Sequence, residues 1–203
     1  MTVGFERQDG RMKLSRISEI RRRELRQAAY EVLQTEGLAG TTLEKVAAHA
    51  GASKGIVLHY FRNKQELFEH AMREANGALR IAVVERLKRA ETPRDRVLAI
   101  IQGNFEPEFF KPSISHAWLS LCAEVPREPQ LARLQKVFHA RMHSNLISAL
   151  KQLTTPEDAE DIARGISAMV DGLWLRLGMD AEAITQGEAL SRTVRFFERA
   201  LPG

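Results

Sequence analysis

The chain has 203 residues, of which 44% are apolar and 28% charged, so it can bury a sizeable core in one large or two small domains. Its apolar runs fall short of the ~20 residues of a membrane-spanning helix, and its polar N-terminus lacks the apolar segment of a signal peptide. The single cysteine, Cys122, excludes an internal disulfide, and we expect a cytoplasmic protein without a membrane segment.

Positive charge is concentrated in the N-terminal third. Residues 1–64 hold 12 Lys and Arg against 7 Asp and Glu, a net charge of +5, whereas the remaining residues hold 18 against 19, a net charge of −1. A basic excess confined to one end is expected of a domain that binds nucleic acid.

The first expected helix covers about residues 18–35. Gly37 is its expected C-terminal cap, and residues 1–15 are expected to form a disordered tail. Four arginines crowd the start of this helix, against its dipole; they are Arg21, Arg22, Arg23 and Arg26. They are either phosphate contacts or part of a solvated face.

The next segment, TTLEKVAAHAGASKGIVLHYFRNK over residues 41–64, predicts two short helices joined by a tight turn. Thr41, followed three residues later by Glu44, predicts a capping box. Gly51 ends the first helix, and Ser53 is a suitable N-cap for the second. Apolar residues follow helical spacing at Leu43, Val46, Ala47 and Ala50. This is the pattern of a helix-turn-helix, whose second helix enters the DNA major groove.

Six further helices are expected, near residues 64–89, 93–101, 113–123, 128–153, 155–177 and 181–201. Gly178 is the expected stop of the fifth, and residues 103–112 are an expected irregular corner. With no strand pattern in the sequence, we predict an all-α fold of about nine helices. The predicted domains are 1–64, for DNA binding, and 65–203, for effector binding and dimerisation.

Apolar residues cover unusually wide faces of the last two predicted helices. They are Ile162, Ile166, Met169, Val170, Leu173 and Leu177, then Leu190, Val194, Phe197 and Leu201. Because one seam needs a narrower stripe, we expect a dimer interface here; the alternative is an intramolecular core.

The second domain combines aromatic side chains with one carboxylate. Asp171 and Trp174 share a face of an otherwise apolar helix, and Trp118 and Phe105 lie in the same domain. An acid in such a helix is unfavourable unless paired, and aromatic faces with a carboxylate hold quaternary ammonium groups. Alternatively, the tryptophans are core and Asp171 pairs with Arg164, Arg176 or a helix end.

Other chemistry is not indicated by the sequence. It has no Gly-rich phosphate loop, no CxxC and no HExxH, so we expect no enzyme and no cofactor. His139 and His143 have a spacing that suits a shared metal, but no third ligand is near in sequence, and we expect an exposed pair. Cys122 has no basic neighbour within two residues, which argues against a redox sensor.

GASKGIVLHYFRNKQELF (residues 51–68) resembles the recognition-helix segment of the TetR family of bacterial repressors, of which the ending HYF-x-x-K is typical. The resemblance implies a dimer that binds operator DNA. Expected phosphate contacts are Thr41, Thr42, Lys45, Ser53, Tyr60 and Lys64. Expected base-edge contacts are Lys54, Gly55, Ile56, Leu58 and His59. Where the family often has Thr and Tyr, this chain has Ile56 and Leu58, so those contacts become apolar, for instance with thymine methyl groups.

A narrower resemblance concerns GNF, HAWLSL, RLQKV, SNL and DGLWLR in the second domain, with RRR and GIVLHYF in the first. They are similar to the BetI branch of the TetR family, repressors of choline-to-glycine-betaine genes. The resemblance implies a repressor released or loosened by choline, bound among Phe105, Trp118, Asp171 and Trp174. The alternatives are a TetR-type regulator of efflux or lipid genes with a larger hydrophobic effector, and a helical enzyme or interaction module with a vestigial helix-turn-helix.

Overall fold

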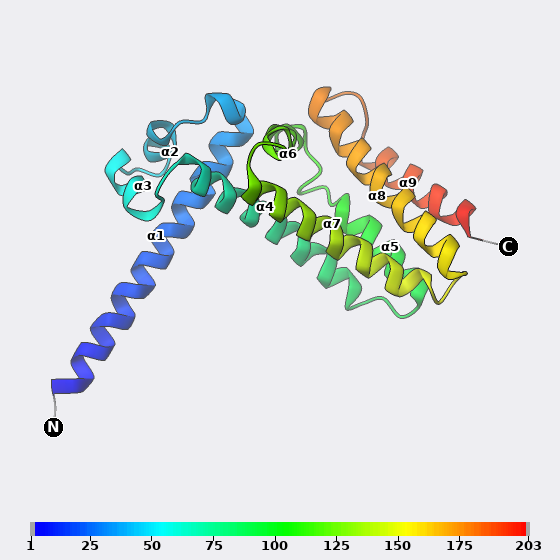
Figure 1. Cartoon of the computed structure of the whole chain (residues 1–203), viewed down its shortest axis with the longest axis horizontal. Coiled ribbons are helices and arrows are strands. Elements are labelled where there is room, and N and C mark those ends of the chain that lie inside the picture. Colours follow the sequence, from blue (N-terminus) through cyan, green and yellow to red (C-terminus); the bar gives the residue numbers. More distant parts are fainter. Residues whose placement is uncertain (1–2, 202–203) are drawn as a thin grey trace. The chain divides into compact units, whose positions relative to one another are not determined.

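The computed structural model describes the backbone of residues 3–201 and the side chains of residues 16–201. Every regular element in this part of the chain is an α-helix, nine in all (Figure 1). The predicted all-α class is therefore confirmed. None of the helices described here is long and apolar enough to cross a membrane.

The chain divides into two compact units within one helix, α4 (Lys64–Leu87). The first unit ends at Glu74 and the second begins at Ala75, whereas the sequence predicted a boundary after Lys64. The physical reason is that the first turns of α4 are tied to α1. Lys64 donates to the carbonyl of Leu38 at 3.3 Å, and Arg26 lies 3.5 Å from the carboxylate of Glu74.

Helix α1 (Val3–Gly40) is longer than predicted at its N-terminal end. It takes in residues 3–15, which were expected to be disordered; residues 1 and 2 lie outside the described residues. The segment contains no proline that would stop a helix. At Gly37 the backbone leaves the helical conformation, with φ 65°, which is where the helix was predicted to end.

The turn between α2 (Leu43–His49) and α3 (Lys54–Tyr60) is a Schellman motif. The N–H of Ala52 donates to the carbonyl of Ala47 at 2.8 Å, and that of Gly51 to the carbonyl of Ala48 at 3.2 Å. Gly51 has φ 58°, a conformation that costs glycine little and other residues more. The prediction that Gly51 ends the first helix and separates it from the second is thus confirmed.

The N-cap of α2 is Thr42, so the capping box predicted from Thr41 was wrong. Oγ1 of Thr42 accepts from the N–H of Lys45 at 3.2 Å. Thr41 is fully buried, and its hydroxyl donates to the carbonyl of Gly37 at 2.6 Å. The Thr41 side chain is thus directed at α1, and the residue at the N-cap position of α2 is Thr42.

The second unit holds the rest of α4 and five further helices. They are α5 (Pro93–Asn104), α6 (Pro112–Glu124), α7 (Pro129–Leu150), α8 (Pro156–Met179) and α9 (Gln186–Ala200). Four of them begin at a proline, which suits the first helical turn because its N–H would have no partner there. Helix α8 packs against α5, α6, α7 and α9, so it forms the centre of this unit.

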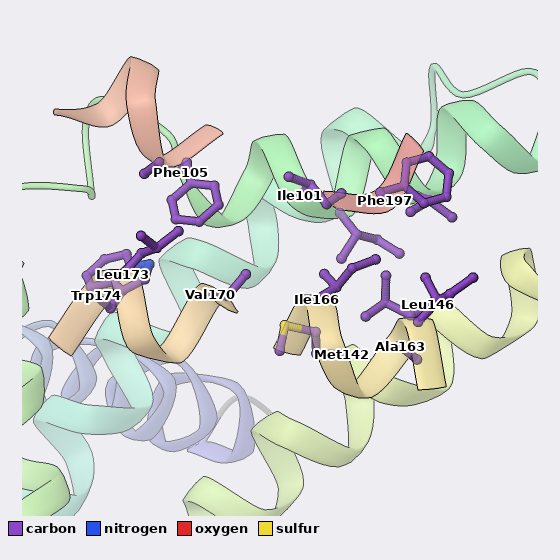
Figure 2. Packing of buried hydrophobic residues seen from close by; sticks show 14 of the residues in the cluster. Ile101, Phe105, Met142, Leu146, Ala163, Ile166, Val170, Leu173, Trp174 and Phe197 are labelled. Atoms are coloured by element: carbon purple, nitrogen blue, oxygen red, sulfur yellow. The ribbon is translucent and has the colours of Figure 1, made fainter. Parts of the chain in front are cut away.

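One hydrophobic core runs along α8 (Figure 2). The apolar residues of α8 and α9 that were expected at a dimer interface lie mostly in this core; those that are buried are Ile162, Ile166, Val170, Leu173, Leu177 and Phe197. The intramolecular alternative therefore holds for these side chains.

Helix α8 continues past Gly178 to Met179, although the sequence predicted a stop at that glycine. A Cβ atom at Gly178 would lie 2.9 Å from the carbonyl oxygen of Ser115 on α6. The glycine therefore serves the close approach of two helices rather than the end of one.

Candidate nucleic-acid interface and effector site

The outward face of α3 is set by one buried residue. Val57 is fully buried, and on a helix of 3.6 residues per turn the opposite direction falls between Gly55 and His59. Ile56 and Leu58 flank that direction and are 39% and 43% exposed. Four of the predicted base-edge residues therefore do share the exposed side of α3.

Both helices of the helix-turn-helix begin with a side-chain cap. Oγ of Ser53 accepts from the N–H of Ile56 at 3.3 Å, as Oγ1 of Thr42 does for α2. These hydroxyls fix the start of each helix, and a helix start with free N–H groups attracts phosphate.

Two of the three lysines predicted to contact DNA are each paired with an acid. Nζ of Lys45 lies 2.7 Å from a carboxylate oxygen of Glu36, and Nζ of Lys54 lies 2.7 Å from one of Glu44. All four side chains are about half exposed, so DNA phosphates would compete with carboxylates for these ammonium groups.

Three other predicted phosphate contacts have partners within the protein. Thr41 is buried, and the ammonium of Lys64 both donates to the Leu38 carbonyl and lies 5.1 Å from the ring centroid of Phe68. The main-chain carbonyl of Tyr60 accepts from Arg22 at 2.8 Å. The ring of Tyr60 is half-buried and packs edge-on against the ring of His59.

Three of the four arginines clustered on α1 have partners within the protein. Arg22 holds the end of α3, Arg21 pairs with Glu24 at 2.8 Å, and Arg26 pairs with Glu19 at 3.2 Å. Arg23 is exposed and forms no ion pair with any described side chain. It is therefore the member of the cluster whose charge has no acidic partner among the described side chains.

In the second unit, two contacts and one electrostatic interaction show the register of α6 against α8. The approach of Ser115 to Gly178 is the first, and Trp118 meets Trp174 one turn further along, with ring centroids 6.2 Å apart. One more turn along, the charge of Asp171 acts on the thiol of Cys122. The two helices thus run antiparallel, and Trp118, Trp174 and Asp171 lie on facing sides.

The ring of Trp174 is anchored at its inner end. Nε1 donates to the carbonyl of Asn104 at 3.0 Å, and the ring packs edge-on against Phe110 with centroids 5.3 Å apart. Phe105 packs edge-on against Phe110, with ring centroids 5.2 Å apart, and is fully buried. Figure 2 shows Phe105 next to Trp174 in the core. Phe105 therefore supports the site from the core instead of lining it.

Asp171 is paired with His139 of α7, a partner that sequence reasoning did not consider. Nε2 of His139 lies 3.3 Å from Oδ2 of Asp171. The hydrogen bond with Asp171 raises the pKa of His139, although partial burial opposes it. The arginines considered from sequence are not the partners: Arg164, for example, pairs with Glu160 at 2.9 Å.

His139 and His143 each face a different acid of α8. His143 lies 3.2 Å from Glu160, which precedes Asp171 along α8. Within the described residues, no group of three or more His, Cys, Asp and Glu side chains is placed to hold a metal ion. Burial and the nearby Asp171 raise the pKa of Cys122 to about 12, which keeps its thiol protonated and unreactive.

Comparison with known proteins agrees with both halves of this description. Residues 25–71 match the family described as bacterial regulatory proteins of the TetR family, and residues 93–202 match the C-terminal domain of BetI-type transcriptional repressors. The HTH-type transcriptional regulator BetI of Escherichia coli K12 is 36% identical over 185 residues, covering 90% of this chain and 95% of that protein.

Solved structures share the fold over nearly the whole chain. A transcriptional regulator from Pseudomonas aeruginosa PAO1 superposes with a TM-score of 0.77 at 25% identity, covering 89% of this chain and 90% of that one. A transcriptional regulator from Saccharomonospora viridis, solved in complex with choline, superposes with a TM-score of 0.75 at 17% identity, covering 89% and 96%.

The chain combines a helix-turn-helix in a basic unit with a second helical unit in which a carboxylate lies near aromatic rings. This combination defines a ligand-responsive DNA-binding repressor. Together with the sequence matches, it shows that the chain belongs to the BetI-type branch of the TetR family.

Proposed function

We propose that this repressor responds to choline, and that it controls genes of choline-to-glycine-betaine conversion. The observation that carries the proposal is the arrangement of Asp171 beside the Trp118–Trp174 pair. Indole faces attract a trimethylammonium group by cation–π interaction, and a carboxylate supplies the opposite charge. The choline complex of the Saccharomonospora viridis regulator, which has the same fold, supports the same class of ligand.

Choline changes DNA binding only if it prefers one conformation of the repressor. A ligand with equal affinity for the DNA-binding and the released forms shifts nothing, however tightly it binds. The site lies between α6 and α8, so we propose that an occupied site moves α6, and that α4, which spans both units, transmits the change.

The test is thermal unfolding with choline, betaine aldehyde, glycine betaine and tetramethylammonium. A ligand at 100 times its Kd stabilises the folded protein by about 2.7 kcal/mol, which gives a measurable rise in Tm. We expect choline to raise the Tm of the wild type and not that of Asp171→Asn. The matched control is Glu160→Gln, because Glu160 pairs with the neighbouring His143 in the same way. A choline shift that persists in Asp171→Asn would contradict the proposed site.

We further propose a homodimer that binds a two-fold symmetric operator in the cytoplasm. Opposite its buried seam, α8 carries a second stripe at helical spacing; it consists of Ala168, Gly172, Leu175 and Met179. Met179 is 73% exposed and Gly172 faces open space, so this stripe is available to a second copy of the chain. A dimer presents two α3 helices to half-sites about one DNA turn apart.

A further inference from the structure

The carboxylate proposed to hold the effector's cation is already paired with a side chain of the protein. His139 on α7 approaches Asp171 on α8 to 3.3 Å, and the two side chains are 43% and 35% exposed. A protonated imidazole at this distance occupies the place on the carboxylate that a cationic effector needs.

Gln135 can satisfy His139 in either protonation state. Its Nε2 lies 3.0 Å from Nε2 of His139, which is the nitrogen that faces Asp171. One ring nitrogen cannot accept from an amide and donate to a carboxylate at the same time. Oε1 of Gln135 is buried and has no hydrogen-bond partner among the described residues. A half-turn of the amide brings this oxygen to Nε2. Gln135 therefore donates to the neutral imidazole, and in the protonated one its Oε1 shares the single Nε2–H with Asp171.

The charges around His139 are few, and Asp171 dominates them. Its hydrogen bond and its charge both raise the pKa of His139, and no charge on α5 or α6, which also pack against α7, acts on that pKa among the described residues. Cys122 faces Asp171 from α6, but with a pKa of about 12 it stays neutral. His143, the next histidine on α7, faces Glu160 instead.

We propose that His139 is a specificity-determining residue of the effector site, because its imidazolium competes with the effector's ammonium for Asp171 and a choline-class cation binds with release of one proton. This inference rests on the proposed choline response. In the exchange, the ion pair between His139 and Asp171 is replaced by one between the quaternary ammonium and Asp171, and the imidazole proton passes to water.

The competition favours ligands with a permanent positive charge. A quaternary ammonium keeps its charge at every pH, so it gains the carboxylate as soon as His139 becomes neutral. A neutral ligand of the same shape gains nothing from the carboxylate and cannot drive the exchange. His139 thus adds a requirement for charge to the shape and aromatic character of the site.

Binding that releases one proton has a defined pH dependence. Only the fraction of protein with neutral His139 is competent, so the apparent association constant rises about tenfold per pH unit below the pKa of His139 and is constant above it.

The experiment is isothermal titration calorimetry of the full chain with choline chloride, from about pH 5.5 to about pH 8.5, the range over which histidine titrates. Running each pH in two buffers of different ionisation enthalpy gives the number of protons released. We expect about one proton at the acid end and none at the basic end. The neutral analogue of choline, with a tert-butyl group in place of the trimethylammonium, should release none at any pH.

Three variants separate the role of His139 from general effects on the fold. His139→Gln keeps a hydrogen bond to Asp171 without a charge, so choline should bind it with the same affinity at every pH. His139→Arg places a permanent cation on the carboxylate, so binding should be weakened throughout. His143→Gln is the matched control, because it changes an equivalent pair with Glu160; it should keep the pH dependence of the wild type.

The outcomes distinguish this inference from the function on which it rests. Choline binding to the wild type with a constant affinity and no proton release would overturn the role of His139 and leave the choline response intact. If choline binds neither the wild type nor His139→Gln at any pH, both proposals fail, since the variant removes the competing charge.

Discussion

The ammonium of Lys64, in the first turn of α4, donates to the carbonyl of Leu38 at 3.3 Å and lies over the ring of Phe68. It joins the end of α1 to the start of α4 within the first unit. The resemblance to the TetR family predicts that this lysine contacts a DNA phosphate. In the structure its contacts are with Leu38 and Phe68, and they stabilise the first unit.

Replacing Lys64 by methionine keeps an apolar stem over Phe68 and removes the donor and the charge. The half-buried hydrogen bond and cation–π contact together predict that Lys64→Met lowers the free energy of unfolding by about 1–2 kcal/mol. Denaturant titration measures this change. The salt dependence of binding to a random-sequence duplex should stay that of the wild type.

Arg23 is the matched control for that measurement. It is exposed and has no ion pair with a described side chain, so Arg23→Ala should leave stability unchanged. If it contacts a phosphate, its removal lowers the salt slope by about one. The reverse result, with Lys64→Met changing the slope and Arg23→Ala changing the stability, would exchange the two roles.

Glu44 pairs with Lys54 at the start of α3, so its carboxylate competes with DNA phosphates for the Lys54 ammonium. The hydrogen bond from Lys54 lowers the pKa of Glu44, so the carboxylate is charged at neutral pH. Glu44→Gln should therefore raise the affinity for a random-sequence duplex at low salt, with a smaller effect at high salt because of screening.

Fluorescence anisotropy at several salt concentrations measures this effect. The control is Glu85→Gln, which removes the acid from a pair with Lys88 that also has a separation of 2.7 Å but lies in the second unit. Equal effects of the two substitutions would mean that net charge, and not the release of Lys54, determines the affinity.

The exposed stripe of α8 predicts how the dimer can be broken. Leu175→Glu places a charge in the middle of this stripe, where a second copy of the chain would have to bury it. We expect sedimentation equilibrium to show a monomer with unchanged helix content. Ile81→Glu changes another exposed apolar residue, on α4, which is 57% exposed against 39% for Leu175, and should leave a dimer. A dimeric Leu175→Glu would place the interface elsewhere.

The sequence predicted features that depend on a few neighbouring residues. Gly51 and Ser53 were located correctly, because a left-handed turn and a helix cap each depend on one side chain and its neighbouring backbone. Thr41 and Thr42 are both suitable N-caps in the sequence. In the structure Thr42 accepts from the N–H of Lys45, whereas the Thr41 hydroxyl is buried and donates to the carbonyl of Gly37. Such a choice needs the tertiary structure.

The effector site depended on contacts between helices distant in sequence. Trp174 and Asp171 could be placed on one face of a helix by their spacing alone. That Trp118 faces them, and that His139 pairs with the acid, follows from the docking of α6 and α7 on α8. The wide apolar coverage of α8 was visible in sequence, but which stripe is core and which is exposed was not.

His70 makes the stability of the first unit sensitive to acid. It lies on α4 with its ring edge-on to Phe61, centroids 5.5 Å apart. Burial lowers the pKa of His70, and the charges of Arg26 and Arg22 lower it further. The unfolded chain therefore takes up a proton at the ordinary histidine value of ~6.5, before the folded chain does. The stability contributed by neutral His70 is present above that pH and is lost as pH falls through the folded-state value.

Thermal unfolding between about pH 5 and about pH 8, where histidines titrate, tests this prediction. The Tm of the wild type should fall on the acid side, and His70→Gln should reduce that fall. His139 gives the opposite sign, because its pKa is raised: its pair with Asp171 stabilises the protein at acid pH and is lost as pH rises, so His139→Gln should lower the Tm only on the acid side. Parallel Tm curves for the wild type and His70→Gln would show that another group is responsible for the acid sensitivity.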